Sequence, residues 1–276
     1  LLESVAHGTP QARYDVLFAF PGDSLVLESN GTLQHNGAPI AGDFLATFDA
    51  TWRAAPVSEQ TELPFPFHGG WFVFLSYELA RFLEPTLAIM SPGNDWPVAV
   101  VTRFPAAVIR DHATRTTLLV SESSNDNTLN QMEQDLRRAE GGAGDPGMPV
   151  SAAEIEEENP ALYRQRIARI LGYIRAGDTY QVNLSRAWHL RLKQRAAAVD
   201  LYEQLRRANP APFAGLMSID ADRAVISSSP ERLVSVRHGR ICTRPIAGTY
   251  PRSVNAEEDQ ALAKALPSDA TILAAN

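Results

Sequence analysis

Short apolar runs separated by turn residues fill the first 120 positions, and this pattern predicts strands. Residues 14–20 are apolar and aromatic and stop at Pro21-Gly22. Residues 24–27 are followed by Asn30-Gly31, which is typical of a hairpin turn because both residues tolerate positive φ. Residues 44–52 have the spacing of a short helix. Further apolar runs predict strands at 98–101, 106–109 and 116–120.

One apolar run differs from the others in its length. Residues 69–77 are almost continuously apolar behind two glycines, which predicts a buried strand. The composition then changes, and residues 141–147 are rich in glycine, which holds regular structure poorly. We therefore place a linker at 121–152, between a first part at 1–120 and a second part at 153–276.

The second part mixes helices and strands. Asn159-Pro160 predicts the start of a helix with one apolar face, and Gly177 predicts its end. Residues 179–185 alternate in polarity and predict a strand. Further patterns predict helices at 200–208 and 255–266 and strands at 213–219, 224–228, 233–236 and 240–243. Helices and strands do not alternate regularly, so we expect an α+β fold with largely antiparallel sheets.

Composition and charge narrow the function classes. The 276 residues include 25 Lys and Arg against 32 Asp and Glu, a net charge of −7, so charge alone gives no affinity for nucleic acid. The sequence contains no run of about 18 apolar residues, so it predicts no membrane span. Cys242 is the only cysteine, which excludes an intrachain disulfide and fits a reducing compartment. The opening Leu1-Leu2-Glu3-Ser4 does not have the pattern of a signal peptide, and we expect a cytoplasmic protein. The sequence does not begin with an initiator Met, and we expect the chain to be truncated at both ends.

Two stretches carry candidate chemistry. In the first, Gln181, Asn183 and Ser185 share one face of the predicted strand by the period of two. A continuous polar face is poor core material, so it lines a polar cavity or faces solvent at a sheet edge. The sequence leaves both interpretations open.

In the second stretch, Glu231 follows a proline at the end of a predicted strand, and Arg244 and Arg252 flank Gly248-Thr249. Backbone N–H groups, a hydroxyl and guanidinium groups suit a small molecule that carries a carboxylate. A turn with surface arginines would have the same residues, and their types do not separate the two interpretations.

Together these stretches resemble the chorismate-utilising enzyme family, and the resemblance spans essentially the whole chain. It rests on Tyr180-Gln181-Val182-Asn183-Leu184-Ser185, Ser228-Ser229-Pro230-Glu231-Arg232 and Arg244-Pro245-Ile246-Ala247-Gly248-Thr249, with Leu1-Leu2-Glu3-Ser4, Ala12-Arg13-Tyr14-Asp15 and Gly69-Gly70-Trp71 upstream. The resemblance implies two subdomains whose largely antiparallel sheets pack face to face, with helices outside.

Within the family, the chain is most similar to aminodeoxychorismate synthase component I, which makes 4-amino-4-deoxychorismate for 4-aminobenzoate and folate synthesis. Asn183 fits that group, because anthranilate synthases usually have an apolar residue there. Ala247 points the other way, because many aminodeoxychorismate synthases carry a nucleophilic lysine at this position and anthranilate synthases carry alanine. Alanine has no nucleophilic atom, so ammonia would have to attack the substrate directly.

The resemblance implies roles for particular residues. Chorismate would be the substrate, ammonia would come from a glutamine amidotransferase partner, and Mg²⁺ would bridge the ring carboxylate. Glu231 would protonate the departing C4 hydroxyl, and Gln181 would line the ring pocket. Gly248 and Thr249 would hold a substrate carboxylate, with Arg244 as a further substrate-binding residue.

The resemblance also implies a site where tryptophan is a feedback inhibitor or a tightly held structural ligand. Its positions are Ser4, Arg13, Tyr14, Pro212, Phe213 and Ala214, which could equally be core. The family's Mg²⁺-binding carboxylates correspond to positions beyond Asn276. We therefore expect no metal site within this chain and no turnover by the chain alone.

Other interpretations remain open. Anthranilate synthase component I would convert chorismate to anthranilate and pyruvate. Isochorismate- or salicylate-forming relatives typically place lysine where Gln181 stands, as a base for water activation. A tryptophan-binding regulatory chain would bind tryptophan but show no Mg²⁺-dependent chorismate binding even at full length.

Overall fold

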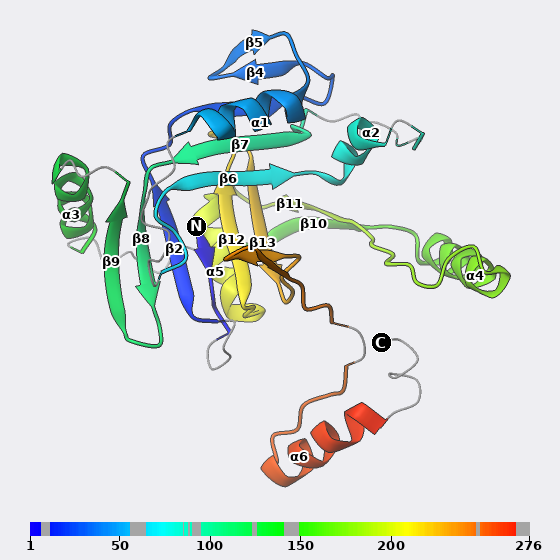
Figure 1. The fold of residues 1–276 in the computed structure, drawn as a ribbon. Helices are drawn as coiled ribbons and strands as arrows, with labels where there is room; N and C mark the ends of the chain where they lie inside the picture. Colours follow the sequence, from blue (N-terminus) through cyan, green and yellow to red (C-terminus); the bar gives the residue numbers. More distant parts are fainter. Residues whose placement is uncertain are drawn as a thin grey trace. The chain divides into compact units, whose positions relative to one another are not determined.

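The computed structural model describes residues 1–6, 12–55, 65–84, 86–87, 89, 95–122, 126–140, 149–246 and 249–268. The chain forms two compact units, whose elements are labelled in Figure 1. The first consists of Leu1–Ala143, Pro210–Gly215 and Ser227–Asn276, and the second of Gly144–Asn209 and Leu216–Ile226. Strand pairings are antiparallel wherever the structure gives their register, and the predicted α+β fold is confirmed.

The two units do not follow chain order. Strand β1 (Leu2–Glu3) pairs with β12 (Phe213–Ser218), which lies far away in the sequence. This pairing brings Pro210–Gly215 into the first unit. The linker predicted at 121–152 rests on local composition, which does not report pairing between residues that are distant in the sequence. Helix α3 (Asp126–Glu140) occupies part of that expected linker.

One sheet of the fold has six strands in the order β13-β12-β1-β2-β8-β9. The bounds not yet given are β13 (Ala224–Ser229), β2 (Tyr14–Ala19), β8 (Ala106–Asp111) and β9 (Thr116–Ser121). Val16, Ala107, Ile109 and Val120 form a buried cluster on it. Phe18 and Phe67 both pack against this cluster, and their rings meet edge to face with 5.0 Å between the centroids. The predicted strands in this region are confirmed.

The other large sheet has five strands in the order β5-β4-β3-β7-β6. Their bounds are β3 (Ser24–Leu27), β4 (Leu33–His35), β5 (Ala38–Ile40), β6 (Gly70–Leu75) and β7 (Ala99–Phe104). Helix α1 (Phe44–Ala54) contributes Phe44 to the buried cluster, together with Leu25 and Val101. Asp43 caps this helix by accepting a 2.9 Å hydrogen bond from the N–H of Ala46.

The apolar run at 69–77 is not a fully buried strand, which corrects the sequence prediction. Within the described residues, β6 lies at the sheet edge and pairs only with β7. Trp71 packs against Phe48 with 5.4 Å between ring centroids, but Val73 and Leu75 are 43% and 51% exposed. A continuous apolar run carries no information about which neighbouring element covers each face.

Gly69, directly before β6, permits a close approach of the Glu122 side chain. Gly69 has a φ of +109°, and a Cβ there would lie 2.0 Å from the Glu122 side chain. Arg103 forms an ion pair with that carboxylate and donates from Nη1 to the carbonyls of Gly70, at 2.9 Å, and Phe104, at 3.0 Å. A side chain at position 69 would therefore displace the Glu122–Arg103 pair.

The second unit contains a two-stranded ribbon and a long helix. Strand β10 (Ala152–Glu157) pairs with β11 (Trp188–Leu192), and helix α4 (Pro160–Ala176) lies between them in the sequence. Asn159 caps the amino terminus of α4, and Gly177 ends it with a φ of +82°. The helix bounds predicted from these two residues are confirmed.

Residues 179–185 do not form a strand, which is a second correction. They have no regular secondary structure, and the side chains of Gln181, Asn183 and Ser185 are exposed. Alternating polarity is a local signal, whereas a strand also needs a neighbour for its ladder of hydrogen bonds. No described strand pairs with this segment, so the predicted polar strand face does not form.

A hairpin and further helices complete the described fold. Strand β14 (Ser235–Arg237) pairs with β15 (Arg240–Cys242). The other elements are α5 (Ala198–Ala208), α6 (Ala256–Ala265), the short η1 (Tyr77–Leu79) and α2 (Ala80–Leu83), and η2 (Leu266–Ser268). Among the described residues, no helix is both long and apolar enough to span a bilayer.

Candidate active site

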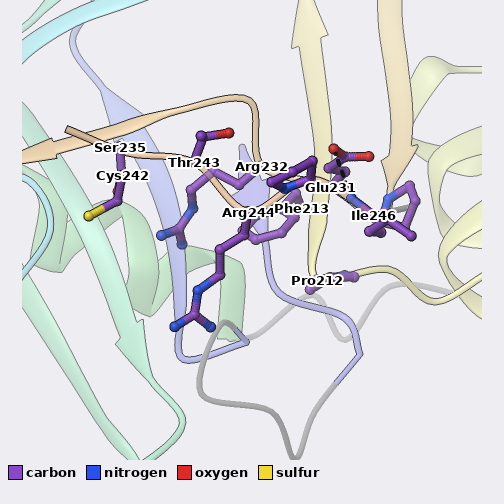
Figure 2. A pocket seen from close by; sticks show the side chains of 11 residues that line it. Pro212, Phe213, Glu231, Arg232, Ser235, Cys242, Thr243, Arg244 and Ile246 are labelled. Atoms are coloured by element: carbon purple, nitrogen blue, oxygen red, sulfur yellow. Dashed lines mark hydrogen bonds between the residues drawn. The ribbon is translucent and has the colours of Figure 1, made fainter. Parts of the chain in front are cut away.

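A cavity of about 350 Å³ opens in the first unit beside Glu231 (Figure 2). Residues 212–213, 230–232 and 242–246 line it together with Ser235. We call it the Glu231 cavity. Its volume lies in the range of sites that bind small molecules.

The β14–β15 hairpin holds the two predicted motifs together. Its register pairs Ser235 with Cys242, and Thr243 Oγ1 donates a 3.0 Å hydrogen bond to the carbonyl of Leu233 next to the paired residues. The segments that enter and leave the hairpin therefore run side by side. This brings Glu231 and Arg244 to one cavity, although they belong to separate motifs in the sequence.

Glu231 lies in a tight turn directly after β13. Ser229 Oγ accepts a 3.2 Å hydrogen bond from the N–H of Glu231 and donates a 3.0 Å hydrogen bond to its carbonyl. The carboxylate Oε1 accepts a 3.3 Å hydrogen bond from the N–H of Ile246. The side chain is also exposed and lines the cavity, so its carboxyl is accessible to a molecule bound there.

Two guanidinium groups share the cavity with that carboxylate. Figure 2 shows the side chains of Arg232 and Arg244 extending to the same side, away from Glu231. The guanidinium carbon of Arg232 lies 4.9 Å from the centroid of the Phe213 ring, a cation–π contact. Neither guanidinium pairs with a carboxylate of the described residues. Such a cavity suits an anionic ligand with a flat apolar part.

A second cavity, of about 260 Å³, lies in the same unit and is called the Ser4 cavity here. The structure brings together in it five of the six residues for which the sequence predicts tryptophan binding, and Arg13 is the exception. Apolar side chains and two arginines face the same space: Leu2, Val16, Phe213, Arg232 and Arg237.

Ser4 is buried and held by three hydrogen bonds. Its single hydroxyl proton is shared between the carbonyls of Tyr14, 2.9 Å from Oγ, and Pro212, 3.3 Å from Oγ, and its N–H donates to Asp15 Oδ1 at 2.8 Å. These bonds join the end of β1 to β2 and to the residue before β12. Ser4 therefore shapes the cavity by fixing the strands around it.

Arg13 makes a different contact. Its guanidinium forms two hydrogen bonds with buried Asp111, Nε to Oδ1 at 3.1 Å and Nη2 to Oδ2 at 2.9 Å. These bonds hold the pKa of Asp111 well below its ordinary value of 3.8, and they raise the pKa of Arg13. Arg13 thus links the start of β2 to the end of β8, and it does not line the Ser4 cavity.

The other predicted substrate-binding residues are outside the Glu231 cavity as described. Gln181 belongs to the second unit, where its side chain is exposed. Thr249 is exposed, and Ala247 and Gly248 lie outside the described residues. Their roles in substrate binding therefore stay predictions.

Arg252, which flanks the same motif, has a structural partner. Its Nε donates to Asp259 Oδ1 at 2.7 Å and its Nη2 to Oδ2 at 2.6 Å, which ties the segment before α6 to that helix. Hydrogen bonds from Arg252 lower the pKa of Asp259. Among the arginines of the motif, Arg244 lines the cavity and Arg252 does not.

The sequence prediction omits Arg232 as a site residue. With Pro212 and Phe213, Arg232 lines both the Glu231 cavity and the Ser4 cavity. Its position next to Glu231 in the motif is a signal that could have found it. Its contact with Phe213 depends on the tertiary structure, because the two residues come from different segments.

The residues around Glu231 do not fit a Mg²⁺ site. This ion prefers an octahedron of oxygen ligands, whereas the cavity offers one carboxylate beside two guanidinium groups. Across the described part of the chain, no group of three or more His, Cys, Asp or Glu side chains is placed to hold a metal ion.

Comparison with known families identifies the class of protein. Residues 9–270 match the family model described as chorismate binding enzyme. This match covers most of the chain, so the chain belongs to the chorismate binding enzymes. The family resemblance inferred from the three motifs is confirmed.

Particular relatives carry two different names. The chain is 35% identical over 248 residues to anthranilate synthase component 1 of Streptomyces coelicolor, covering 84% of this chain and 48% of that protein. It is 30% identical over 250 residues to aminodeoxychorismate synthase component 1 of Klebsiella aerogenes, covering 90% of this chain and 54% of that protein. The chain therefore spans about half the length of these relatives.

A solved structure supports the same fold. The crystal structure of anthranilate synthase component I from Streptococcus pneumoniae matches with a TM-score of 0.73 and 25% sequence identity. The match covers 97% of this chain and 59% of that chain. The predicted likeness to the fold of anthranilate synthase component I is confirmed.

Proposed function

We propose that the Glu231 cavity binds chorismate, and that the protein aminates it to 4-amino-4-deoxychorismate as an aminodeoxychorismate synthase component I. Chorismate binding is supported by one carboxyl and two guanidinium groups that line a cavity of about 350 Å³, where neither guanidinium has a carboxylate partner among the described residues. Chorismate has two carboxylates, a ring, and a hydroxyl that must leave. The cavity offers a group of suitable chemistry for each.

The proposed roles follow from charge. Arg232 and Arg244 attract the substrate carboxylates, and Phe213 contacts the apolar part of the molecule. Ammonia forms the new C–N bond as the C4–O bond breaks. Glu231 gives its proton to the departing hydroxyl, which leaves as water, and the nitrogen loses a proton. Chorismate and ammonia are thereby converted to aminodeoxychorismate and water.

The choice of product rests on two positions. Asn183 supports aminodeoxychorismate, because the Gln-Val-Asn-Leu segment resembles those synthases. Ala247 supports the second candidate, anthranilate synthase component I, which would release anthranilate, pyruvate and water. Relatives named for each activity occur among the similar proteins.

The Ser4 cavity is the proposed tryptophan site. Leu2, Val16 and Phe213 suit an indole, and Arg232 and Arg237 suit the carboxylate of the amino acid. A glutamine amidotransferase is the proposed source of ammonia, supported by the designation of the relatives as component 1. Mg²⁺ is proposed as a cofactor of the whole protein, with ligands outside the described residues.

Product analysis of the full-length protein tests the proposed reaction. The protein is incubated with chorismate, Mg²⁺ and ammonium, and the products are separated by chromatography. We expect aminodeoxychorismate, which added lyase converts to 4-aminobenzoate. Anthranilate with pyruvate would instead establish the second candidate, and unconsumed chorismate would exclude both.

Chorismate binding by calorimetry tests the cavity itself. We expect Arg244→Ala to weaken binding by at least about tenfold, because it removes a charged hydrogen-bond partner. Arg240→Ala is the matched control, since Arg240 is exposed on β15 outside the cavity lining. Equal effects of both substitutions would place the substrate elsewhere.

A further inference from the structure

The side chain of Ser229 holds the turn that carries Glu231. Its hydroxyl binds both polar backbone groups of Glu231, because Oγ accepts from the N–H at 3.2 Å and donates to the carbonyl at 3.0 Å. Pro230, between the two residues, has a restricted φ and no N–H that could compete for Oγ. Ser229 and Pro230 together therefore determine the direction in which the Glu231 side chain leaves the backbone.

The far end of the Glu231 side chain has a contact of its own. The N–H of Ile246 donates to Oε1 at 3.3 Å, and Figure 2 shows the two residues next to each other. The other carboxyl oxygen, Oε2, has no hydrogen-bond partner among the described residues. The two carboxyl oxygens thus have different surroundings, although they are chemically equivalent in a free side chain.

Hydrogen bonds, and not packing, define where this carboxyl lies. The Glu231 side chain is exposed, so few neighbouring atoms restrict its rotation. A glutamate side chain has three rotatable bonds and would occupy several rotamers if it were free. A general acid must lie within hydrogen-bond distance of the atom that it protonates. An unrestrained Glu231 would therefore be in the correct place only part of the time.

Ser229 can influence a bound molecule only through its neighbours. It is half-buried at the end of β13 and is not among the described residues that line the Glu231 cavity. Its printed hydrogen bonds both go to Glu231. A direct contact between Ser229 and a ligand of the cavity is thus not needed to explain an effect of Ser229 on the reaction.

We propose that Ser229 is a positioning residue, which holds the carboxyl of Glu231 at the N–H of Ile246 so that the transferable proton is on Oε2. The carbonyl oxygen of a neutral carboxylic acid is the better acceptor, so the contact with Ile246 selects Oε1 for that role and leaves the hydroxyl at Oε2. The effect on catalysis rests on the proposed function. The contact between Glu231 and Ile246 does not.

Steady-state kinetics of the full-length protein with chorismate, Mg²⁺ and ammonium test the effect on catalysis. We expect Ser229→Ala to lower kcat by about 10–100-fold, because a misplaced acid transfers its proton less often. The affinity for chorismate should change by less than about threefold, since the cavity lining is intact. The value of kcat is expressed per binding site counted by calorimetry, which removes the effect of unfolded protein.

Two further serine variants serve as controls. Ser229→Thr keeps the hydroxyl and suits a strand, so it should restore kcat to within about threefold of the wild type. Ser227→Ala removes a hydroxyl two residues earlier on the same face of β13, and Ser227 is not among the described residues that line the cavity. It should change kcat by less than about twofold.

A double variant shows whether Ser229 acts through Glu231. If its only role in the reaction is to place the acidic proton, Ser229→Ala should cause no further loss of kcat once Glu231→Gln has removed that proton. A merely structural role of Ser229 would lower kcat by the same factor in both backgrounds. The comparison therefore separates positioning from general stabilisation.

A measurement without chorismate tests the contact itself. In the full-length protein labelled with ¹⁵N-isoleucine, the Ile246 amide signal is identified by its loss in Ile246→Val. We expect this signal to shift with pH as the Glu231 carboxyl ionises, and Glu231→Gln should abolish the shift. Ser229→Ala should reduce the shift by at least about half, because hydrogen bonds weaken steeply when their geometry is lost.

The outcomes separate this inference from the proposed function. An active wild type with an unchanged kcat in Ser229→Ala, or with equal losses in both backgrounds, would overturn the positioning role and leave the proposed function intact. A wild type that does not consume chorismate would overturn the role in catalysis together with the proposed function. An Ile246 amide that responds equally in the wild type and in Ser229→Ala would overturn the contact that Ser229 is proposed to hold.

Discussion

The guanidinium group of Arg232 stacks on the ring of Phe213, with 4.9 Å from the guanidinium carbon to the ring centroid. Both side chains line the Glu231 cavity and the Ser4 cavity. The two cavities therefore share a wall, and a change in that wall alters both.

Replacing the ring of Phe213 tests the shared wall. We expect Phe213→Ala to weaken binding of both chorismate and tryptophan by about tenfold, because it removes apolar contact area and the support of Arg232. Calorimetry with each ligand measures the two effects. Ile246→Ala is the control, since Ile246 lines only the Glu231 cavity, and it should affect chorismate alone. A Phe213→Ala protein that loses affinity for one ligand only would contradict the shared wall.

Removing the acidic proton of Glu231 separates binding from chemistry. Glu231→Gln keeps an oxygen that can accept the hydrogen bond from the N–H of Ile246 but cannot protonate a leaving hydroxyl. In the full-length protein, we expect chorismate affinity to change little and kcat to fall by about 10²–10⁴. Steady-state kinetics and calorimetry provide the two numbers. Unchanged kcat would remove Glu231 from the role of general acid.

The Arg13–Asp111 pair makes stability depend on pH. The pKa of Asp111 lies below its ordinary value of 3.8 in the folded chain, so the folded state favours the carboxylate. This contribution is fully present at pH values well above 3.8 and is lost as the pH falls below that value. Urea unfolding at a series of pH values measures it.

Two variants isolate that effect. Asp111→Asn should lower stability at neutral pH and flatten its dependence on pH below about 4. Asp49→Asn is the control, because Asp49 belongs to an exposed i,i+4 ion pair on α1. This substitution should leave the loss of stability at acid pH close to that of the wild type. If the stability of the wild type and of Asp111→Asn fell equally with decreasing pH, the Arg13–Asp111 pair would be excluded as the cause of that fall.

Two glycines should respond in opposite directions to substitution by alanine. At Gly69, a Cβ would collide with the Glu122 side chain at a φ of +109°, and we expect a loss of about 1–3 kcal/mol. At Gly172, inside α4, the added Cβ would meet no described atom within 4 Å apart from its chain neighbours and the backbone of its own helix, and we expect a small gain from helix propensity. Thermal unfolding of both variants measures the difference. Stabilisation by Gly69→Ala would show that the loop tolerates a side chain.

Local signals in the sequence were sufficient for many elements. Asn159 and Gly177 determine the ends of α4, because capping depends on hydrogen bonds and backbone angles within a few residues. Asn255 likewise caps the start of α6. The motif around Glu231 likewise identified the family and the carboxyl of the candidate site, because its residues are close together in the sequence.

Relationships between distant residues were decided only by the tertiary structure. The exposure of β6 depends on which elements cover each face, and the segment at 179–185 has no described neighbour to pair with. Arg13 meets Asp111 because β2 pairs with β8, and Arg232 meets Phe213 through segments that are separate in the sequence. Patterns of polarity report the conformation that a segment prefers, whereas packing selects its neighbours from the whole chain.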